Sequence, residues 1–587
     1  MKKKKIKYIV CLILVLFMVN SVSIQGQEPP KTAASSTSEY NEKVVVTAPY
    51  QPTLEAIYKP TLTPSFADTV VEITNVDYDI ISRPVNTVYP IENIKPAKVT
   101  GEPIPKLFNQ HIKIGFGTHL SPLAEAYFSM GRSKQYALSA SYRHLSGYGY
   151  VKDYHTFKTD HSLNEADVLG EIFADKFTVG LKVNYHQKKV NCYGYKDGNH
   201  IHSPEMGEFE TNPVRWYQNV GGSLFFKDNS TRLDDWKFDA ALNYNLNLTN
   251  WKSSENFIGV DGGFDKSLLV SDKNVDRLSI GTRIFFGDYT YRDGIRLGNG
   301  VGNQLQNAFI FELMPKISYR YSIFQLEGAL KLNIFGQGKD PVKVQFNPIL
   351  DLQIHAVENI LTAFVGVGGD VERSTVLSIS EINPFLHPLD FTDMSFMQDK
   401  FQVYLGVKGN FSRNIDYRLQ LSVHWKDHVQ NFDYYGYRSG VAGTVGYNDF
   451  LPIYTNKVFN FRAKGEVNFR WSERILAHVE ATYNYYNKDL SYTPAFEAKV
   501  SFRYNIGNKF IITSEILGYT NMKAFDRYGK PSILKGCFDW SVGFEYRFLK
   551  RWSTFVNLNN LIAQRYFRWY DYPSYRFNCM LGVTVAF

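Results

Sequence analysis

Apolar and polar residues alternate along the chain from about residue 110 to its end. In the stretch KFTVGLKVNYH, every second side chain is apolar, and these side chains are Phe177, Val179, Leu181, Val183 and Tyr185. The same alternation returns in 417–425 and 459–469. A period of two places such side chains on one face of a β-strand. The pattern therefore predicts an all-β region built from many strands.

The opposite face of these strands carries charged and hydrogen-bonding side chains. In the last two stretches and the residues beside them, its members are Arg418, Gln420, His424, Lys426, His428, Arg462, Lys464 and Glu466. Such a face cannot be the core of a small β-sandwich, because buried charges need partners. It suits a water-filled lumen, with the apolar face against lipid. We therefore interpret these residues as lumen-facing positions of a transmembrane antiparallel β-barrel that contacts outer-membrane lipid.

The connections between the predicted strands alternate in length. Tight joints lie near residues 131, 174, 321, 357, 412, 471, 506 and 549. Between them lie the long segments 147–161, 191–214, 289–305, 374–398, 430–455, 521–534 and 565–573. Transmembrane barrels have short periplasmic turns and long extracellular loops. The spacing predicts about 22 strands, with both termini on the periplasmic side.

The last stretch, 576–587, keeps the strand pattern up to the final residue, Phe587. An open strand edge in lipid would leave backbone groups unpaired, so we expect this strand to close the barrel against 111–117. A closing strand that ends in Phe resembles the signal by which the outer-membrane barrel assembly machinery selects its clients, and Phe587 is the candidate signal residue. A chance strand in a secreted β-sandwich is the alternative.

The first residues and the composition agree with export. Residues 1–26 hold five lysines and then an apolar run, which is typical of a secretory signal peptide. Its removal lowers the formal charge from +8 to +3, so nucleic acid is not an expected partner. No later stretch is apolar enough for a transmembrane helix. The chain has 40 Tyr and 43 Phe, yet its mean hydropathy is only -0.27, as alternation would produce.

Prolines set residues 27–108 apart from the predicted barrel, 109–587. This segment of 82 residues holds 11 of the 23 prolines. Prolines favour extended backbone and exclude helix interiors. We therefore expect a periplasmic or lumenal arm that is not a domain of its own.

Within the arm, the stretch EKVVVTAP resembles the TonB box of TonB-dependent receptors. Its residues are Glu42, Lys43, Val44, Val45, Val46, Thr47 and Ala48. A TonB box offers a strand to a TonB-like periplasmic protein by strand addition. An arm that pairs with the barrel wall or fills the lumen is the other interpretation of the same residues.

The resemblance continues through 89–136, in YPIENIKPAKVTGEPIPKL and IKIGFGTHLSPLAEAYFSMGRSKQY. These stretches are similar to a family of Gram-negative outer-membrane barrels that are TonB-dependent receptor-like but have no recognisable plug. The resemblance implies an outer-membrane transporter or receptor for a ligand that it does not identify. With 82 residues before the barrel there are too few for a standard plug, so the arm, inward-folded loops or an accessory envelope protein must block the lumen.

Few residues suggest other chemistry. His200, His202 and Glu205 share one predicted loop and could hold a divalent metal, although a solvated polar loop is the alternative. No Ser-centred catalytic motif is present, so we do not expect an enzyme, and we expect no cofactor. A barrel enzyme whose site is assembled in three dimensions is a less favoured alternative. Removal of the signal peptide leaves three cysteines without close spacing, which argues against a disulfide framework. A scaffold barrel in an envelope assembly complex is the alternative to transport.

Overall fold

The computed structural model describes residues 108–587, apart from 131–132, 197–212, 231–234, 271–276, 294–304, 388–393, 435–448, 473 and 527–528. The predicted signal peptide and the TonB-box-like residues 42–48 lie outside the described residues. The predicted metal ligands His200, His202 and Glu205 lie outside them as well.

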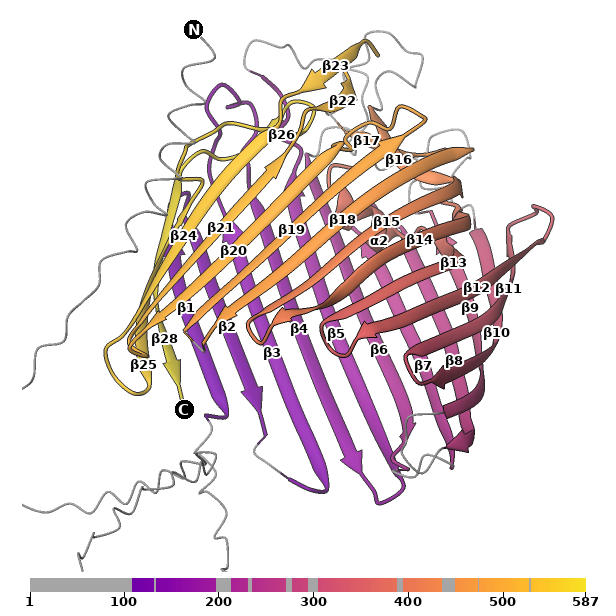
Figure 1. The fold of residues 1–587 in the computed structure, drawn as a ribbon. Coiled ribbons are helices and arrows are strands. Elements are labelled where there is room, and N and C mark those ends of the chain that lie inside the picture. Colours follow the sequence, from indigo (N-terminus) through magenta and orange to yellow (C-terminus); the bar gives the residue numbers. More distant parts are fainter. Residues whose placement is uncertain are drawn as a thin grey trace, which may run out of the picture. The chain divides into compact units, whose positions relative to one another are not determined.

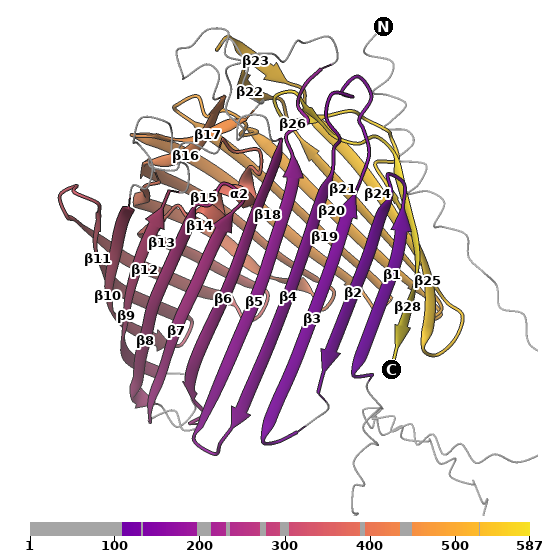
Figure 2. The same cartoon turned by 180° about the vertical axis from the view of Figure 1, so that it is seen from behind.

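Twenty-two strands form one antiparallel sheet (Figures 1 and 2). They are β1 (Gln110–Gly117), β2 (Ser121–Ser129), β3 (Tyr136–Gly147), β4 (His161–Phe173), β5 (Phe177–Asn191), β6 (Val214–Asp228), β7 (Trp236–Thr249), β8 (Ser254–Val270), β9 (Arg277–Arg292), β10 (Leu305–Tyr321), β11 (Phe324–Gln337), β12 (Lys343–Val357), β13 (Leu361–Arg373), β14 (Phe396–Ser412), β15 (Ile415–Asp427), β18 (Val458–Trp471), β19 (Ile475–Tyr486), β20 (Phe496–Ile506), β21 (Phe510–Tyr519), β24 (Cys537–Arg547), β25 (Trp552–Asn559) and β28 (Asn578–Ala586).

The first and last strands close the sheet into a barrel. β1 pairs with β2 on one side and with β28 on the other, from His111 opposite Ala586 to Gly117 opposite Met580. The N–H of Phe587 donates to the carbonyl of Gln110 at 2.9 Å, so pairing continues to the last residue. Both the strand number and the closing pair that the sequence predicts are confirmed.

The two faces of the sheet differ as the alternation predicts. On β5, Leu181 and Val183 are 51% and 43% exposed. From the opposite face, His186 and Lys188 form ion pairs with Glu381 of α2 (Val376–Ile382). Figures 1 and 2 both show α2 between the front and back walls of the barrel. At β5 the polar face is therefore the inner one, and the apolar face points outward.

Connections at the two ends of the barrel differ in length. One end has short turns, such as 322–323 and 413–414. The first strand begins at this end, at Gln110, and the last strand ends there, at Ala586. The other end carries the long connections, although 118–120 and 250–253 are short there too. Its loops hold α2 and three small two-stranded sheets: β16 (Val429–Tyr434) with β17 (Phe450–Thr455), β22 (Met522–Phe525) with β23 (Pro531–Leu534), and β26 (Phe567–Trp569) with β27 (Tyr572–Pro573). Across the described residues, no helix is long and apolar enough to cross a membrane.

Candidate functional site: a capped lumen

The main hydrophobic core of the described chain lies at the long-loop end of the barrel. Its buried members come from the ends of strands and from the loops that follow β5, β7, β13, β15, β19, β21 and β25. We call this cluster the loop cap. They are Val190, Cys192, Tyr195, Tyr217, Trp251, Tyr291, Val376, Ile379, Phe385, Leu386, Met394, Phe432, Phe450, Tyr492, Tyr519, Met522, Ala524, Leu534, Cys537, Trp569 and Tyr572. Aromatic rings hold separate loops together, as where Phe385 stacks on Tyr572 with ring centroids 3.7 Å apart.

The loop cap crosses the mouth of the barrel. Arg215 on β6 reaches Asp449, which lies just before β17, with Nη2 and Oδ2 2.9 Å apart. β17 belongs to the connection between β15 and β18, and β15 stands nine places from β6 around the ring of 22 strands. The two residues therefore come from nearly opposite walls. A direct contact between them is possible only where loops fold inward over the opening.

Hydrogen bonds satisfy part of this buried contact, although Oδ1 of Asp449 is buried without a hydrogen-bond partner in the described chain. Arg215 Nε donates to the carbonyl of Leu386 at 2.8 Å. Asp449 Oδ2 also contacts Nδ1 of His387 at 2.9 Å. The side chains of Arg215 and Asp449 are only 2% and 1% exposed. A buried pair of this kind is a weak source of net stability, but loss of one partner leaves a buried charge and costs roughly 3–5 kcal/mol.

Helix α2 is fixed to the wall by a buried carboxylate. Glu255 Oε2 accepts the N–H of Val376 at 2.9 Å and Nδ2 of Asn247 at 3.1 Å. Thr375 caps the helix, since its hydroxyl accepts the N–H of Ser378 at 3.1 Å. At the other end of the helix Glu381 binds β5. Helix α2 is thus tied to the β5–β8 side of the barrel by polar contacts. The segment that follows it also bonds to the loop after β15, where the N–H of Phe450 donates to the carbonyl of Phe385 at 2.9 Å.

Burial also changes the acidity of one cap residue. Cys192 follows β5 and is fully buried. Burial in this apolar environment raises the pKa of its thiol to about 11. A thiol in this state is a poor nucleophile, because the reactive thiolate is scarce at neutral pH.

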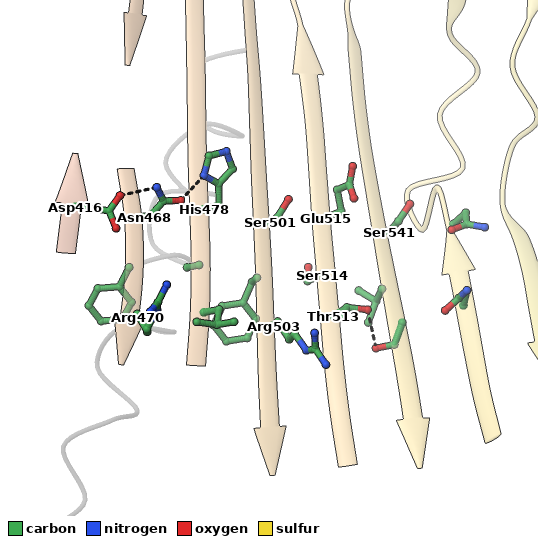
Figure 3. Close-up of a pocket in the computed structure, with 18 residues that line it drawn as sticks. Asp416, Asn468, Arg470, His478, Ser501, Arg503, Thr513, Ser514, Glu515 and Ser541 are labelled. Atoms are coloured by element: carbon green, nitrogen blue, oxygen red, sulfur yellow. Dashed lines mark hydrogen bonds between the residues drawn. The ribbon is translucent and has the colours of Figure 1, made fainter. Parts of the chain in front are cut away.

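Below the cap, the wall contains a cavity of about 690 Å³ (Figure 3). We call it the wall pocket. Its polar lining includes Asp416, Asn468, Arg470, His478, Ser501, Arg503, Thr513, Ser514, Glu515 and Ser541. These residues come from β15 and β18–β21, with Ser541 from β24. The register makes Asn468, His478, Ser501, Glu515 and Ser541 successive cross-strand neighbours.

Small residues create the hollow, and hydrogen bonds orient its rim. A Cβ at Gly543 would lie 2.5 Å from Oγ1 of Thr513, so a larger residue there would displace the Thr513 side chain. Asn468 Nδ2 donates to Oδ1 of Asp416 at 2.6 Å, and its own Oδ1 contacts Nδ1 of His478, also at 2.6 Å. The wall pocket therefore presents carboxylate, imidazole and guanidinium groups together, which suits a polar ligand held by several hydrogen bonds.

Most of the lumen-facing residues predicted from the sequence share one face of β15 and β18. Arg418 is opposite Glu466, and Gln420 is opposite Lys464. Lys464 also forms an ion pair with Glu480 on β19 at 2.8 Å. The other predicted members on these strands are His424, Lys426 and Arg462, while His428 lies beyond the end of β15.

The wall pocket itself was not predicted from the sequence. Arg470, His478, Arg503 and Glu515 lie on four strands, and no local motif links them. The sequence does not show which small residues will lie across from these side chains. Those small residues create a hollow only after the strands have paired.

One hydrogen-bond chain has the order of a catalytic triad. Oγ of Ser422 lies 3.0 Å from Nε2 of His424, whose Nδ1 lies 2.7 Å from Oδ2 of Asp399. However, Ser422 is only 4% exposed, and its backbone belongs to the strand ladder. A nucleophile needs access to substrate and free backbone donors for the oxyanion. We interpret this chain as a structural link between β14 and β15.

The fold resembles several solved structures. The FrpB iron transporter from Neisseria meningitidis (F3-3 variant) gives a TM-score of 0.60 at 10% identity, over 82% of this chain and 82% of that chain. A mutant of the ferric enterobactin receptor PfeA from Pseudomonas aeruginosa gives 0.57 at 11% identity, over 82% and 80%. FpvA of P. aeruginosa, bound to heterologous pyoverdines, gives 0.58 at 11% identity, over 82% and 72%.

No protein-family description matches the chain, and no curated protein matches it in sequence. At 10–11% identity the structural likeness establishes the fold alone. This fold is a closed barrel of 22 antiparallel strands.

Proposed function

We propose that this protein is a TonB-dependent receptor-like barrel of the outer membrane that binds and transports a polar ligand. The lumen carries the ligand, and the polar faces of β15 and β18 line it. The observation that carries the proposal is the combination of a mouth crossed by the Arg215–Asp449 contact and a polar wall pocket beneath it. The solved structures of similar fold are an iron transporter and a ferric enterobactin receptor, which supports a transport role rather than an enzymatic one.

The same geometry suggests how entry is controlled. A ligand that comes from the long-loop side meets a packed apolar core, so the loop cap must rearrange before the ligand reaches the wall pocket. We assign the long-loop end to the cell exterior and the short-turn end, with both termini, to the periplasm. Outer-membrane barrels have no energy source of their own, so a TonB-like protein bound to residues 42–48 is the proposed partner.

A scaffold role in an envelope complex is the second candidate. It is favoured by the buried Arg215–Asp449 pair and the aromatic packing of the loop cap, which resemble a permanent closure more than mobile loops. A scaffold barrel needs no opening of the mouth and no ligand in the wall pocket.

Conductance across a planar lipid bilayer tests the closure. We expect the purified wild-type protein to be non-conducting, and Arg215→Ala to give open-channel events because Asp449 loses its charge partner. Arg565→Ala is the matched control, since it removes a cap ion pair with Asp153 (2.9 Å) between loops that are near neighbours around the ring. Equal, silent traces for all three proteins would show that the Arg215 contact is not the sole closure of the lumen.

Uptake and capture assays then separate the two functions. If the barrel is a receptor, it should be captured by a purified TonB-like periplasmic domain, and capture should need residues 42–48. If it is a scaffold, a stoichiometric envelope partner should co-purify from detergent, with no capture by the TonB-like domain.

A further inference from the structure

A second cavity lies in the wall at the short-turn end of β7–β11. Its volume is about 430 Å³, and Ser279, Gly281 and Ser318 are the small residues of its lining. Ser279 and Ser318 are direct partners on β9 and β10, so their side chains share a face. A Cβ at Gly281 would lie 1.9 Å from Oδ1 of Asp265, and glycine is therefore required there. The cavity lining therefore includes two neighbouring hydroxyl groups.

The cavity carries more basic than acidic side chains. Its charged residues are Lys237, Arg277, Lys316 and Arg320 against Asp265 and Glu327. Lys316 already binds Asp265 at 2.9 Å. Three cations are thus left against one carboxylate, and within the described chain none of the three has an ion pair.

Two of these cations stand directly opposite each other. The register pairs Arg277 on β9 with Arg320 on β10, immediately beside the Ser279–Ser318 pair. Like charges in this cross-strand position repel and destabilise a sheet. Arg277 is oriented by a hydrogen bond of 2.8 Å from its Nε to Oγ of Ser267, and its terminal amino groups make no hydrogen bond to the described residues. An anion between the guanidinium groups would remove the repulsion.

The exposed apolar neighbours place these cations inside the barrel. Trp236 and Phe238, on either side of Lys237, are 43% and 50% exposed on the outer face. Tyr319 and Tyr321, on either side of Arg320, are exposed in the same way. The alternation of the strands therefore turns both basic side chains toward the lumen, close to its periplasmic end.

We propose that this cavity, the arginine cavity, is a binding site for a phosphate group. Each guanidinium offers a planar pair of donors that matches phosphate oxygens, and the two serine hydroxyls of the lining add donors. Rings of Arg and Lys select anions and phosphate in pores by the same chemistry. The inference rests on the proposed function, because it names the chemistry of a ligand that enters the lumen. The phosphate belongs either to a small soluble molecule or to a lipid headgroup.

Isothermal titration of the purified full chain in detergent, at low salt, tests the site. Inorganic phosphate is the first probe, and short-chain dihexanoyl phosphatidic acid is the second. The variants are Arg320→Gln and Arg277→Gln with Arg320→Gln. Arg413→Gln is the matched control, since Arg413 is an exposed arginine in the turn between β14 and β15 on another part of the barrel. Heat-modifiable mobility in gels shows that each variant is folded.

We expect saturable phosphate binding by the wild type and by Arg413→Gln. Arg320→Gln removes one guanidinium group and its charge-assisted hydrogen bonds, so phosphate binding should weaken about tenfold. The double variant should bind no phosphate. Binding of phosphatidic acid without inorganic phosphate would identify the lipid as the source and still support the site.

Two results would overturn the proposal. One is the absence of binding of either probe to the wild type, which would mean that Glu327 and water neutralise the cavity. The other is equal affinity in the wild type and the folded double variant. Neither result depends on capture by a TonB-like protein or on ligand uptake, so this proposal and the proposed function fail in different experiments.

Discussion

The ring of Phe555 on β25 lies directly against Gly582 on β28. A Cβ at Gly582 would lie 2.6 Å from Cε1 and Cζ of that ring, and one at Gly115 on β1 would lie 2.9 Å from Cζ. Gly115 and Gly582 are partners across the closing pair of strands. One buried aromatic side chain therefore covers the seam of the barrel from within, and Lys113 Nζ lies 4.5 Å from its centroid. Closure of the barrel at this seam therefore depends on glycine at positions 115 and 582.

We predict that Gly582→Val prevents barrel closure, because its side chain would force Phe555 away from the seam. Folded, heat-modifiable protein in the membrane fraction should fall severely. Gly170→Val on β4 is the control, since a Cβ there meets its nearest neighbour, Leu138 Cδ1, at an ordinary 3.9 Å. Equal folded levels for the two variants would show that the seam tolerates bulk.

The last residue gives a second prediction. Deletion of Phe587 removes the backbone group that donates to Gln110 and accepts from Asn109 at 2.8 Å, together with an exposed terminal ring. We expect a strong loss of membrane assembly, measured as the fraction of heat-modifiable protein. Deletion of Tyr148, an exposed loop residue, is the control. Tyr572 is unsuitable because it is 3% exposed and belongs to the loop cap. If both deletions assemble equally well, Phe587 is not the assembly signal.

Much of the barrel follows from local pattern, and most of the candidate site does not. Alternation in 177–185 fixes which side chains share a face, and loop lengths fix the strand number. The contact of Arg215 with Asp449 joins residues 234 positions apart, and neither residue has a local motif. Tyr572 looks like an ordinary loop tyrosine in the sequence. It becomes a core residue because rings from three other segments, those of Tyr193, Phe385 and Phe450, pack against it.

The buried ion pair of the cap gives a third prediction. Arg215→Met should lower the free energy of unfolding by roughly 3–5 kcal/mol, because Asp449 stays buried without its cation. Asp449→Leu should also destabilise the fold, since the buried guanidinium of Arg215 then loses its ion pair with this carboxylate. The double variant should recover much of the loss, because no buried charge is left. Urea unfolding in lipid vesicles measures the three values. If the loss in the double variant equals the sum of the losses in the two single variants, Arg215 and Asp449 are not energetically coupled.

The thiol of Cys192 reports whether the cap opens. In a background with Cys537→Ala and Cys579→Ala, we expect almost no maleimide labelling of the folded protein at pH 8 and rapid labelling after heating. Burial holds the pKa at about 11, above the 9.0 of an ordinary thiol. The protonated form therefore stabilises the folded cap, and this contribution is lost as pH rises from about 9 through 11. Rapid labelling of folded protein at pH 8 would show that the loop cap is open in solution.

The last prediction tests the arm, whose residues 42–48 lie outside the described chain. If KVVVTA recruits a TonB-like partner through main-chain hydrogen bonds, Val45→Pro removes one donor and restricts φ, so capture of the partner should fall while the barrel stays folded. Val45→Ile keeps the strand preference and should be nearly neutral.

The competing account gives the opposite result in the same pair of assays. If the arm only blocks the lumen, Val45→Pro leaves partner capture unchanged, and deletion of residues 28–100 raises permeability to large antibiotics. The loop cap modifies this expectation, because it already crosses the mouth at the long-loop end of the barrel through Arg215 and Asp449. Deletion of the arm should therefore cause leakage only when the cap is also weakened, as in Arg215→Ala. Leakage after arm deletion alone would show that the cap does not seal the barrel, whereas loss of capture with unchanged permeability supports the receptor.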